Sequence, residues 1–203
     1  MSMGKLRSKA KCEIMYRAGI TPTPSRIQRI PRHTTGSDSG KFEGGLRKMN
    51  PIDPSKFSLD YLLENELITI LSQDYVFEHG TDWDEVDITE FIMNHLTYLC
   101  YCDDWGNPDY SRRFSGVLYE KWDDLNLWYY MHLKDGLRDG IEVHFYKSGK
   151  VLNYRVLNNG RLVGKNYVWY ENGKIDAIND WDQREYVEFD EQGNLTKQGK
   201  MEY

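Results

Sequence analysis

Apolar and polar residues alternate along the last third of the chain. The clearest stretch alternates Ile141, Val143 and Phe145 with Glu142 and His144. A period of two is typical of a β-strand that packs one face and leaves the other face in water. The last third of the chain is therefore predicted to form strands rather than helices.

Glycine turns separate the predicted strands. Asp135-Gly136 and Asn159-Gly160 are dipeptides that favour two-residue hairpins, because both central residues of such a turn need positive φ. Second strands are predicted over residues 151–157 and 175–181, each after a further glycine turn. A hairpin cannot bury its own apolar face, so several hairpins must share one core.

The hairpin pattern occurs twice with a constant offset of 24 residues. Residues 135–151 and residues 159–175 align without a gap. The matching pairs are Gly136/Gly160, Gly140/Gly164, Phe145/Trp169, Tyr146/Tyr170, Gly149/Gly173 and Lys150/Lys174. Weaker copies flank the two clear units, so about four units are predicted over residues 114–203.

Both clear units share one order of residue types. Asp or Asn is followed by Gly, three residues, Gly, four residues, an aromatic residue, Tyr, two residues, Gly, Lys and a hydrophobic residue. This order resembles the MORN-variant repeat of bacterial proteins described as antitoxin or immunity proteins. The resemblance implies a β-meander of stacked hairpin repeats with a protein-binding function. Related repeats also serve as scaffolds beside membranes and as appendages of enzymes, and residues 1–110 have no counterpart in the repeat.

Helical periodicity precedes the repeats. Leucine and isoleucine residues form one broad stripe over residues 54–72, which predicts a helix capped by Ser55 or Ser58. Residues 75–77 are predicted to form a short strand or an extended link. A second helix is predicted over residues 88–101.

The second predicted helix has a capping box and a clear stop. Asp87 is placed as its N-cap with Glu90 three residues later, and His95 lies on its apolar face as a hydrogen-bonded core histidine. Residues 103–108 form the stop. The expected fold class is α+β, in which a helical segment of residues 51–110 packs on the repeats.

Charge divides the chain into two parts. Residues 1–50 hold 11 Lys and Arg against 3 Asp and Glu, a net charge of +8, whereas residues 51–203 hold 15 against 29, a net charge of −14. An acidic body favours a basic partner, and nuclease toxins are basic because they hold phosphate backbones. The alternative interpretation is the mild acidity common among soluble proteins.

The basic segment is predicted to be a disordered or extended arm, because residues 1–50 hold turn and linker residues with few apolar anchors. It has three interpretations: an arm that binds nucleic acid or an anionic surface through residues 1–48, the tail of an upstream module, or a segment before a start at Met49. Residues 36–42 superficially resemble a phosphate-binding loop. The spacing is one residue short, and Phe42 stands where Ser or Thr should hold magnesium.

No catalytic or metal-binding motif stands out in the sequence. The cysteines (Cys12, Cys100 and Cys102) are few and odd in number, which favours a reducing compartment over a disulfide scaffold. The acidic residues Asp82, Asp84, Glu85 and Asp87 lack the glycine and terminal Glu of an EF-hand loop. No apolar run is long enough to span a bilayer. The sequence therefore predicts a soluble cytoplasmic protein that is not an enzyme and carries no cofactor or metal.

The leading hypothesis is an antitoxin or immunity protein that neutralises a cognate toxin by stoichiometric binding and occlusion, with a basic toxin domain as the protein partner. The predicted partner-binding residues are Asp123, Asp124, Trp128, Tyr130, Glu142, Trp169, Glu171, Asp180 and Trp181. One alternative is a non-catalytic scaffold for oligomerisation or for attachment to a membrane or nucleic acid through the basic arm. Another is an enzyme with a site in residues 54–110.

Overall fold

The computed structural model describes residues 52–123 and 125–201. The chain divides into two units, Met1–Ile52 and Asp53–Tyr203, and apart from Ile52 the described residues belong to the second unit. The predicted basic arm of residues 1–50, with the loop of residues 36–42, lies outside the described residues. Asp124 lies outside them as well.

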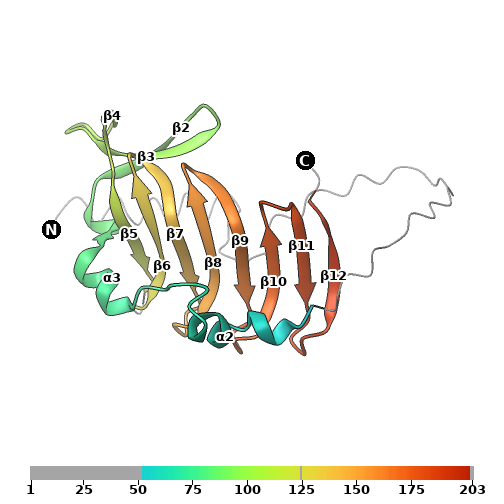
Figure 1. The fold of residues 1–203 in the computed structure, drawn as a ribbon. Helices are drawn as coiled ribbons and strands as arrows, with labels where there is room; N and C mark the ends of the chain where they lie inside the picture. The colour runs from blue at the N-terminus through green and yellow to red at the C-terminus, as the bar shows by residue number, and fades with distance from the viewer. Residues whose placement is uncertain (1–51, 124, 202–203) are drawn as a thin grey trace. The chain divides into compact units, whose positions relative to one another are not determined.

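The second unit is built mainly from antiparallel strands (Figure 1). Its main sheet has nine strands in the order β1-β5-β6-β7-β8-β9-β10-β11-β12. β1 pairs parallel with β5, and every later pair is antiparallel. The bounds are β1 Thr81–Asp82, β5 Gly116–Lys121, β6 Leu127–Lys134, β7 Leu137–Phe145, β8 Val151–Asn158, β9 Arg161–Trp169, β10 Ile175–Asp180, β11 Glu185–Phe189 and β12 Leu195–Lys200. A β-rich fold of consecutive antiparallel hairpins with few helices is thus confirmed.

Two-residue turns join successive strands at one of the two edges of this meander that are formed by strand ends. Between β6 and β7, Asp135 and Gly136 have φ of 50° and 80°, and between β8 and β9, Asn159 and Gly160 have φ of 48° and 77°. Positive φ at both central positions matches the twist of the flanking strands. The predicted hairpin turns are confirmed.

Longer turns with a common geometry lie at the opposite edge. In each turn a backbone N–H donates to the carbonyl oxygen four residues later, from Trp122 to Asn126, Tyr146 to Lys150, Tyr170 to Lys174 and Asp190 to Asn194. The residue before the acceptor has positive φ in every case, and it is Leu125, Gly149, Gly173 and Gly193 in turn. The backbone therefore repeats even at Leu125, where the sequence lacks the glycine.

Repeated tyrosines link successive hairpins across this edge. The hydroxyl of Tyr146 donates to the carbonyl of Trp169 at 2.8 Å, and the hydroxyl of Tyr170 donates to the carbonyl of Phe189 at 2.7 Å. The two tyrosines are 24 residues apart and occupy equivalent turn positions. The repeat thus has a structural role in joining each hairpin to the next one.

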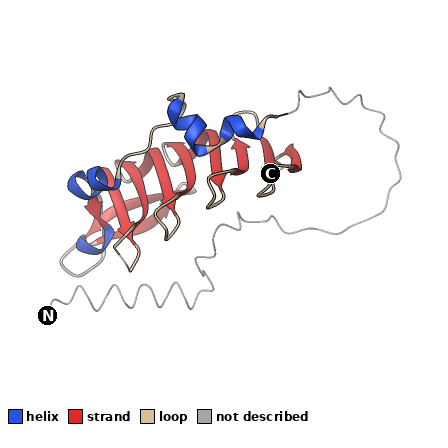
Figure 2. Ribbon diagram, turned by 90° about the horizontal axis from the view of Figure 1, so that it is seen from below, coloured by secondary structure: helices blue, strands red, loops and turns tan. Residues whose placement is uncertain are grey.

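One face of the meander is covered by the segment that precedes it (Figure 2). This segment contains the 3-10 helix η1 (Pro54–Phe57) and the helices α2 (Leu59–Glu64) and α3 (Gln73–His79). The buried indole N–H of Trp169 donates to the carbonyl of Phe57 at 2.9 Å, and the backbone N–H of Leu71 donates to the hydroxyl of Tyr130 at 2.9 Å. These bonds satisfy the polar ends of two aromatic side chains that fill the core.

The predicted helix over residues 54–72 is wrong in its length. The Ser58 cap is confirmed, because its hydroxyl accepts from the N–H of Tyr61, but α2 ends at Glu64. Glu66 has φ of 55°, and two bonds from Glu66 and Leu67 back to the carbonyls of Leu63 and Leu62 form a Schellman motif. The missing glycine hid this stop. The predicted strand or link at residues 75–77 is also wrong, because these residues lie within α3.

The predicted helix over residues 88–101 is wrong in type. These residues form β2 (Ile88–Met93) and β3 (Leu96–Cys102), which pair with β4 (Pro108–Arg113) in a three-stranded antiparallel sheet. Asn94 and His95, with φ of 52° and 63°, form the turn between β2 and β3. The β-branched and aromatic residues of this stretch favour strands, and their apolar spacing also fits a period of two. His95 is therefore exposed at a turn and is not a core residue, and Asp87 does not cap a helix.

This small sheet packs by one face on the meander, so residues 51–110 do not form the helical segment that was expected, although they do pack on the meander. Ile88, Leu99 and Phe114 are buried against Leu118, Met131 and Leu133, with Trp83 of the 3-10 helix η2 (Trp83–Glu85) beside them. The N–H of Leu99 donates to the carbonyl of Gly136 at 2.7 Å. The N–H of Gly136 donates to the carbonyl of Phe114, also at 2.7 Å. A Cβ on Gly136 would lie 2.6 Å from the Leu99 carbonyl oxygen, so glycine is required at this junction.

Candidate protein-docking surface

The structure buries three of the predicted partner-binding residues. Tyr130 and Trp169 are fully buried under the helical segment, and Glu142 is buried on the opposite face of the sheet. Their side chains are closed to a partner protein, so the prediction is wrong for these three. The alternation of the strand was identified correctly and a segment packed on the repeats was expected, but the sequence did not show that this segment covers Tyr130 and Trp169.

The other predicted residues do not form one patch. Asp123 and Glu171 are exposed on longer turns, at the edge that also holds Tyr146 and Tyr170. Asp180 is half-buried and Trp181 is exposed at the opposite edge, in the turn after β10. Trp128 is half-buried, with its ring 5.0 Å from that of Trp122, and Asp124 lies outside the described residues.

Glu142 is the centre of a buried ionic cluster on the face opposite the helices. One carboxylate oxygen accepts from Nε2 of His144 at 2.7 Å and from the guanidinium of Arg155, and Arg138 lies 4.0 Å from the other oxygen. Burial raises the pKa of Glu142, but the His144 hydrogen bond and the nearby positive charges outweigh it and lower the pKa to about 2. Arg138 also lies 3.4 Å from Glu90 of β2. The cluster therefore joins the small sheet to the meander.

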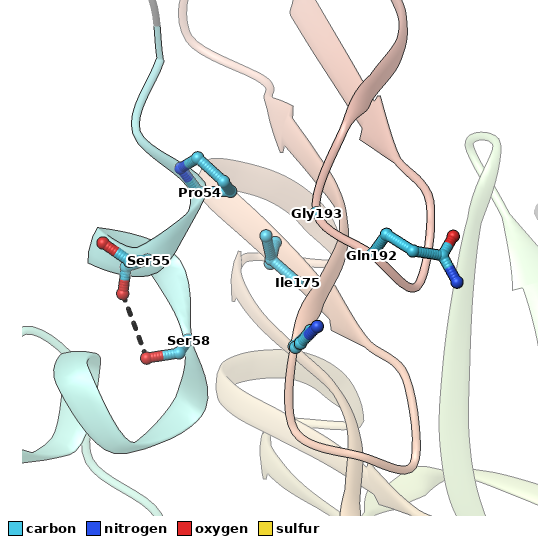
Figure 3. Close-up of a pocket in the computed structure, with 7 residues that line it drawn as sticks. Pro54, Ser55, Ser58, Ile175, Gln192 and Gly193 are labelled. Atoms are coloured by element: carbon cyan, nitrogen blue, oxygen red, sulfur yellow. Dashed lines mark hydrogen bonds between the residues drawn. The ribbon is translucent and has the colours of Figure 1, made fainter.

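A shallow groove lies where η1 meets the turns after β9 and β11 (Figure 3). Its walls include Pro54, Ser58, Ile175 and Gly193, and its volume is about 260 Å³. Ligand pockets usually have volumes of about 300–1,000 Å³ and several convergent polar groups. The Ser58 hydroxyl donates within its own turn to the carbonyl of Ser55 at 3.0 Å (Figure 3). The groove is a seam between elements rather than a strong ligand site.

The small sheet and its turns carry several exposed apolar side chains. On the face away from the meander, the half-buried ring of Phe91 stacks on the buried ring of Tyr98 with 5.3 Å between centroids, and the ring of Tyr110 meets Phe91 edge-on with 4.7 Å between centroids. Tyr110 is 58% exposed, and Met93 at the end of β2 is also exposed. We call the half-buried or exposed side chains Phe91, Met93, Trp105 and Tyr110 the aromatic surface, which runs from the Asn94-His95 turn at one end of β3 to the turn at its other end. Sequence reasoning missed it because residues 88–101 were predicted to be a helix.

Trp105 is displayed on a rigid turn at the end of this sheet. The side chain is 86% exposed, in the turn between β3 and β4. One carboxylate oxygen of Asp103 accepts from the backbone N–H groups of Trp105 and Asn107, at 2.9 and 2.8 Å. These hydrogen bonds lower the pKa of Asp103, and the bond from the N–H of Asn107 has the largest effect. The turn therefore holds a large apolar side chain in water with little freedom of the backbone beneath it.

The aromatic surface has acidic neighbours along the chain. Asp84, Glu85 and Asp87 are exposed just before β2, and Asp104 is exposed beside Trp105. Asp82 is different, because it is buried in an ion pair with Lys121 at 2.5 Å. In residues 52–123 and 125–201, no group of three or more His, Cys, Asp or Glu side chains is arranged to hold a metal ion. Neither Cys100 nor Cys102 is in a disulfide bond in the part of the chain that the structure describes.

The comparisons with known proteins give little further information. No protein-family model matches the chain, and no curated protein matches it. A solved structure described as the GtfA/B complex bound to UDP and GlcNAc is similar with a TM-score of 0.20 and 8% sequence identity. The match covers 56% of this chain and 24% of that chain, and likeness at this level carries no argument about function. No helix among the described residues is long and apolar enough to cross a membrane.

Proposed function

We propose that this chain is a protein-binding module of the antitoxin or immunity type, which occludes a basic toxin domain by stoichiometric binding in the cytoplasm. In this proposal the MORN-like hairpins are a rigid scaffold, and the aromatic surface on the small sheet makes the central contacts with the partner. No residue has a catalytic role and no cofactor is needed.

The aromatic surface is the observation that carries the proposal. Aromatic side chains dominate the binding energy of protein interfaces, and single-chain proteins rarely leave several of them exposed together. Trp105 and Tyr110 stand on a sheet that is hydrogen-bonded to the meander, so little conformational entropy is lost when a partner binds. The net charge of −14 over residues 51–203 would speed the encounter with a basic partner.

Co-expression with the product of the adjacent gene tests the function directly. We expect a complex of fixed stoichiometry that survives purification, and relief of the toxicity that this product causes alone. The double variant Trp105→Ser/Tyr110→Ser should bind at least about tenfold more weakly. The matched control Trp181→Ser, which alters an exposed tryptophan of the meander, should bind like the wild type. Absence of both a complex and protection would refute the proposal.

A scaffold for oligomerisation is the second candidate, and the edge strand β12 of the main sheet favours it. The order of the described strands ends at β12, whose outer edge pairs with no strand among the described residues. Such an edge can pair with another chain. Light scattering at increasing concentration tests this candidate: a constant monomer mass would exclude it, whereas a dimer that is lost on substituting Gln198 by Pro would support it.

A further inference from the structure

A second exposed surface lies on the other side of the main sheet from the aromatic surface. Residues 59–79 (α2, the link after it and α3) form a ridge across the face that contains Tyr130. The small sheet packs around Met131 on the opposite face. We call residues 59–79 the acidic ridge.

The acidic ridge has a packed inner side and an apolar outer side. Leu62 and Val76 are buried beneath it. Leu63 is 40% exposed, Leu67 61% and Tyr75 46%. The ridge therefore presents apolar side chains to solvent at two places, at the end of α2 and in α3.

The charge of the ridge is entirely negative. Residues 59–79 contain no Lys or Arg, and their five acidic residues are all exposed, which gives a net charge of −5. These residues are Asp60, Glu64, Glu66, Asp74 and Glu78. An occupant without positive charge would strip water from the carboxylates without compensation. The phosphates of a nucleic acid or of an anionic membrane would be repelled.

The ridge is held in shape before any partner arrives. The Schellman motif fixes Glu66 and Leu67 after α2, and the Ser72 hydroxyl caps α3 by accepting from the N–H of Tyr75 at 3.2 Å. The ring of Tyr75 stacks on that of His79 at 4.2 Å. An occupant would therefore bind to side chains that are already positioned.

We propose that the acidic ridge binds a basic amphipathic segment of a partner protein, with Lys and Arg side chains paired to the carboxylates and apolar side chains on Leu63, Leu67 and Tyr75. The charge complementarity determines the class of occupant, and the exposed leucines and tyrosine require that it also be apolar. This surface does not depend on the aromatic surface, because the two lie on opposite faces of the sheet.

The test uses the full chain and three synthetic peptides of equal length. The first alternates Lys and Arg with Leu at helical spacing, the second replaces Leu by Ser, and the third replaces the basic residues by Glu. Titration calorimetry at moderate salt should show binding of the first peptide at least tenfold tighter than the second and no binding of the third. Amide hydrogen exchange should show protection over residues 59–79.

Matched variants decide whether the ridge or the overall charge is responsible. Glu64→Gln/Glu66→Gln/Glu78→Gln should weaken binding of the first peptide at least tenfold. The control Asp123→Asn/Glu171→Gln/Glu191→Gln removes the same charge from exposed turns and should change the affinity for the first peptide less than twofold.

Glu66→Gly removes one ridge carboxylate at a position that favours glycine, so weaker binding by this variant cannot be attributed to unfolding. Equal losses in ridge and control variants, equal binding of the first two peptides, or no binding of the first would each overturn the proposal. The co-expression experiment tests the proposed function and the peptide titration tests the acidic ridge, so either proposal can fail while the other stands.

Discussion

The meander and the small sheet treat their apolar side chains in opposite ways. The meander covers Tyr130 and Trp169 completely and satisfies their polar ends with backbone partners. The small sheet buries Ile88 and Leu99 on one face but leaves Tyr110 and Trp105 in water. Because burial of apolar area stabilises a fold and exposure of it favours association, the meander supplies stability and the small sheet supplies a surface for binding.

The largest expected effect is in the core of the meander. Trp169→Ala should lower the free energy of unfolding by about 3–5 kcal/mol, because it leaves a cavity and an unpaired carbonyl at Phe57. Urea denaturation measures the change. The control Trp181→Ala, at an exposed tryptophan, should cost less than about 1 kcal/mol. Equal losses for the two variants would contradict the assignment of Trp169 to the core.

The ionic cluster between the two regions is next in size. Glu142→Gln should destabilise the chain by about 2–3 kcal/mol, because Arg155 and His144 lose charge-assisted hydrogen bonds to a buried carboxylate. The matched control is Glu188→Gln, which removes a carboxylate 3.7 Å from Lys197 at a more exposed position and should cost less than about 1 kcal/mol. Chemical denaturation at neutral pH gives both values. A cost no larger than that of the control would show that the cluster contributes little to the fold.

The same carboxylate predicts how stability depends on pH. The pKa of Glu142 is lowered to about 2 in the folded chain, below the ordinary value of about 4.3 for glutamate. Its contribution is therefore complete above the ordinary pKa and is lost as pH falls toward 2. The difference in stability between the wild type and Glu142→Gln should shrink as pH falls from about 5 toward about 2. A difference that grows over this range would contradict the sign.

A smaller and opposite effect is expected where the backbone is strained. Glu66→Gly and Leu125→Gly should each stabilise the chain by about 1 kcal/mol, because both residues have positive φ. Thermal unfolding monitored by circular dichroism measures the gain. A loss of stability in either variant would show that the native side chain makes contacts that exceed the strain.

The smallest effect on stability is expected on the aromatic surface. Trp105→Ser and Tyr110→Ser should change the free energy of unfolding by less than about 1 kcal/mol, because most of each side chain is already in water. The loss should appear instead as weaker partner binding. If either variant unfolds the small sheet, its side chain belongs to the core and not to a docking surface.

The sequence predicted the regions whose turns contain glycine. The Asp135-Gly136 and Asn159-Gly160 turns were predicted because these dipeptides favour positive φ at both central positions of a hairpin turn. The turns at Asn94-His95 and Glu66 have the same left-handed backbone without glycine. For this reason residues 88–101 were predicted to be one helix, and the helix that begins after Ser58 was predicted to extend beyond Glu64. Strand spacing and helical spacing also coincide over short apolar runs, which periodicity alone does not separate.

The partner-binding residues were only partly predictable. Alternation identified which residues of a strand share a face, but the covering of one face depends on the path of residues 53–80, which no local pattern specifies. Tyr130 and Trp169 were placed on the surface for this reason. Trp105 was visible in the sequence only as part of a stop signal, because its exposure depends on the Asp103 turn.

Hydrogen exchange of the complex with the adjacent gene product tests the central claim most directly. We expect new protection in residues 89–93 and 103–110, with exchange in β7, β8 and β9 unchanged from the slow rates of the free chain. Protection confined to the turns of the meander, with residues 89–110 exchanging as in the free chain, would contradict the assignment of the aromatic surface as the docking site.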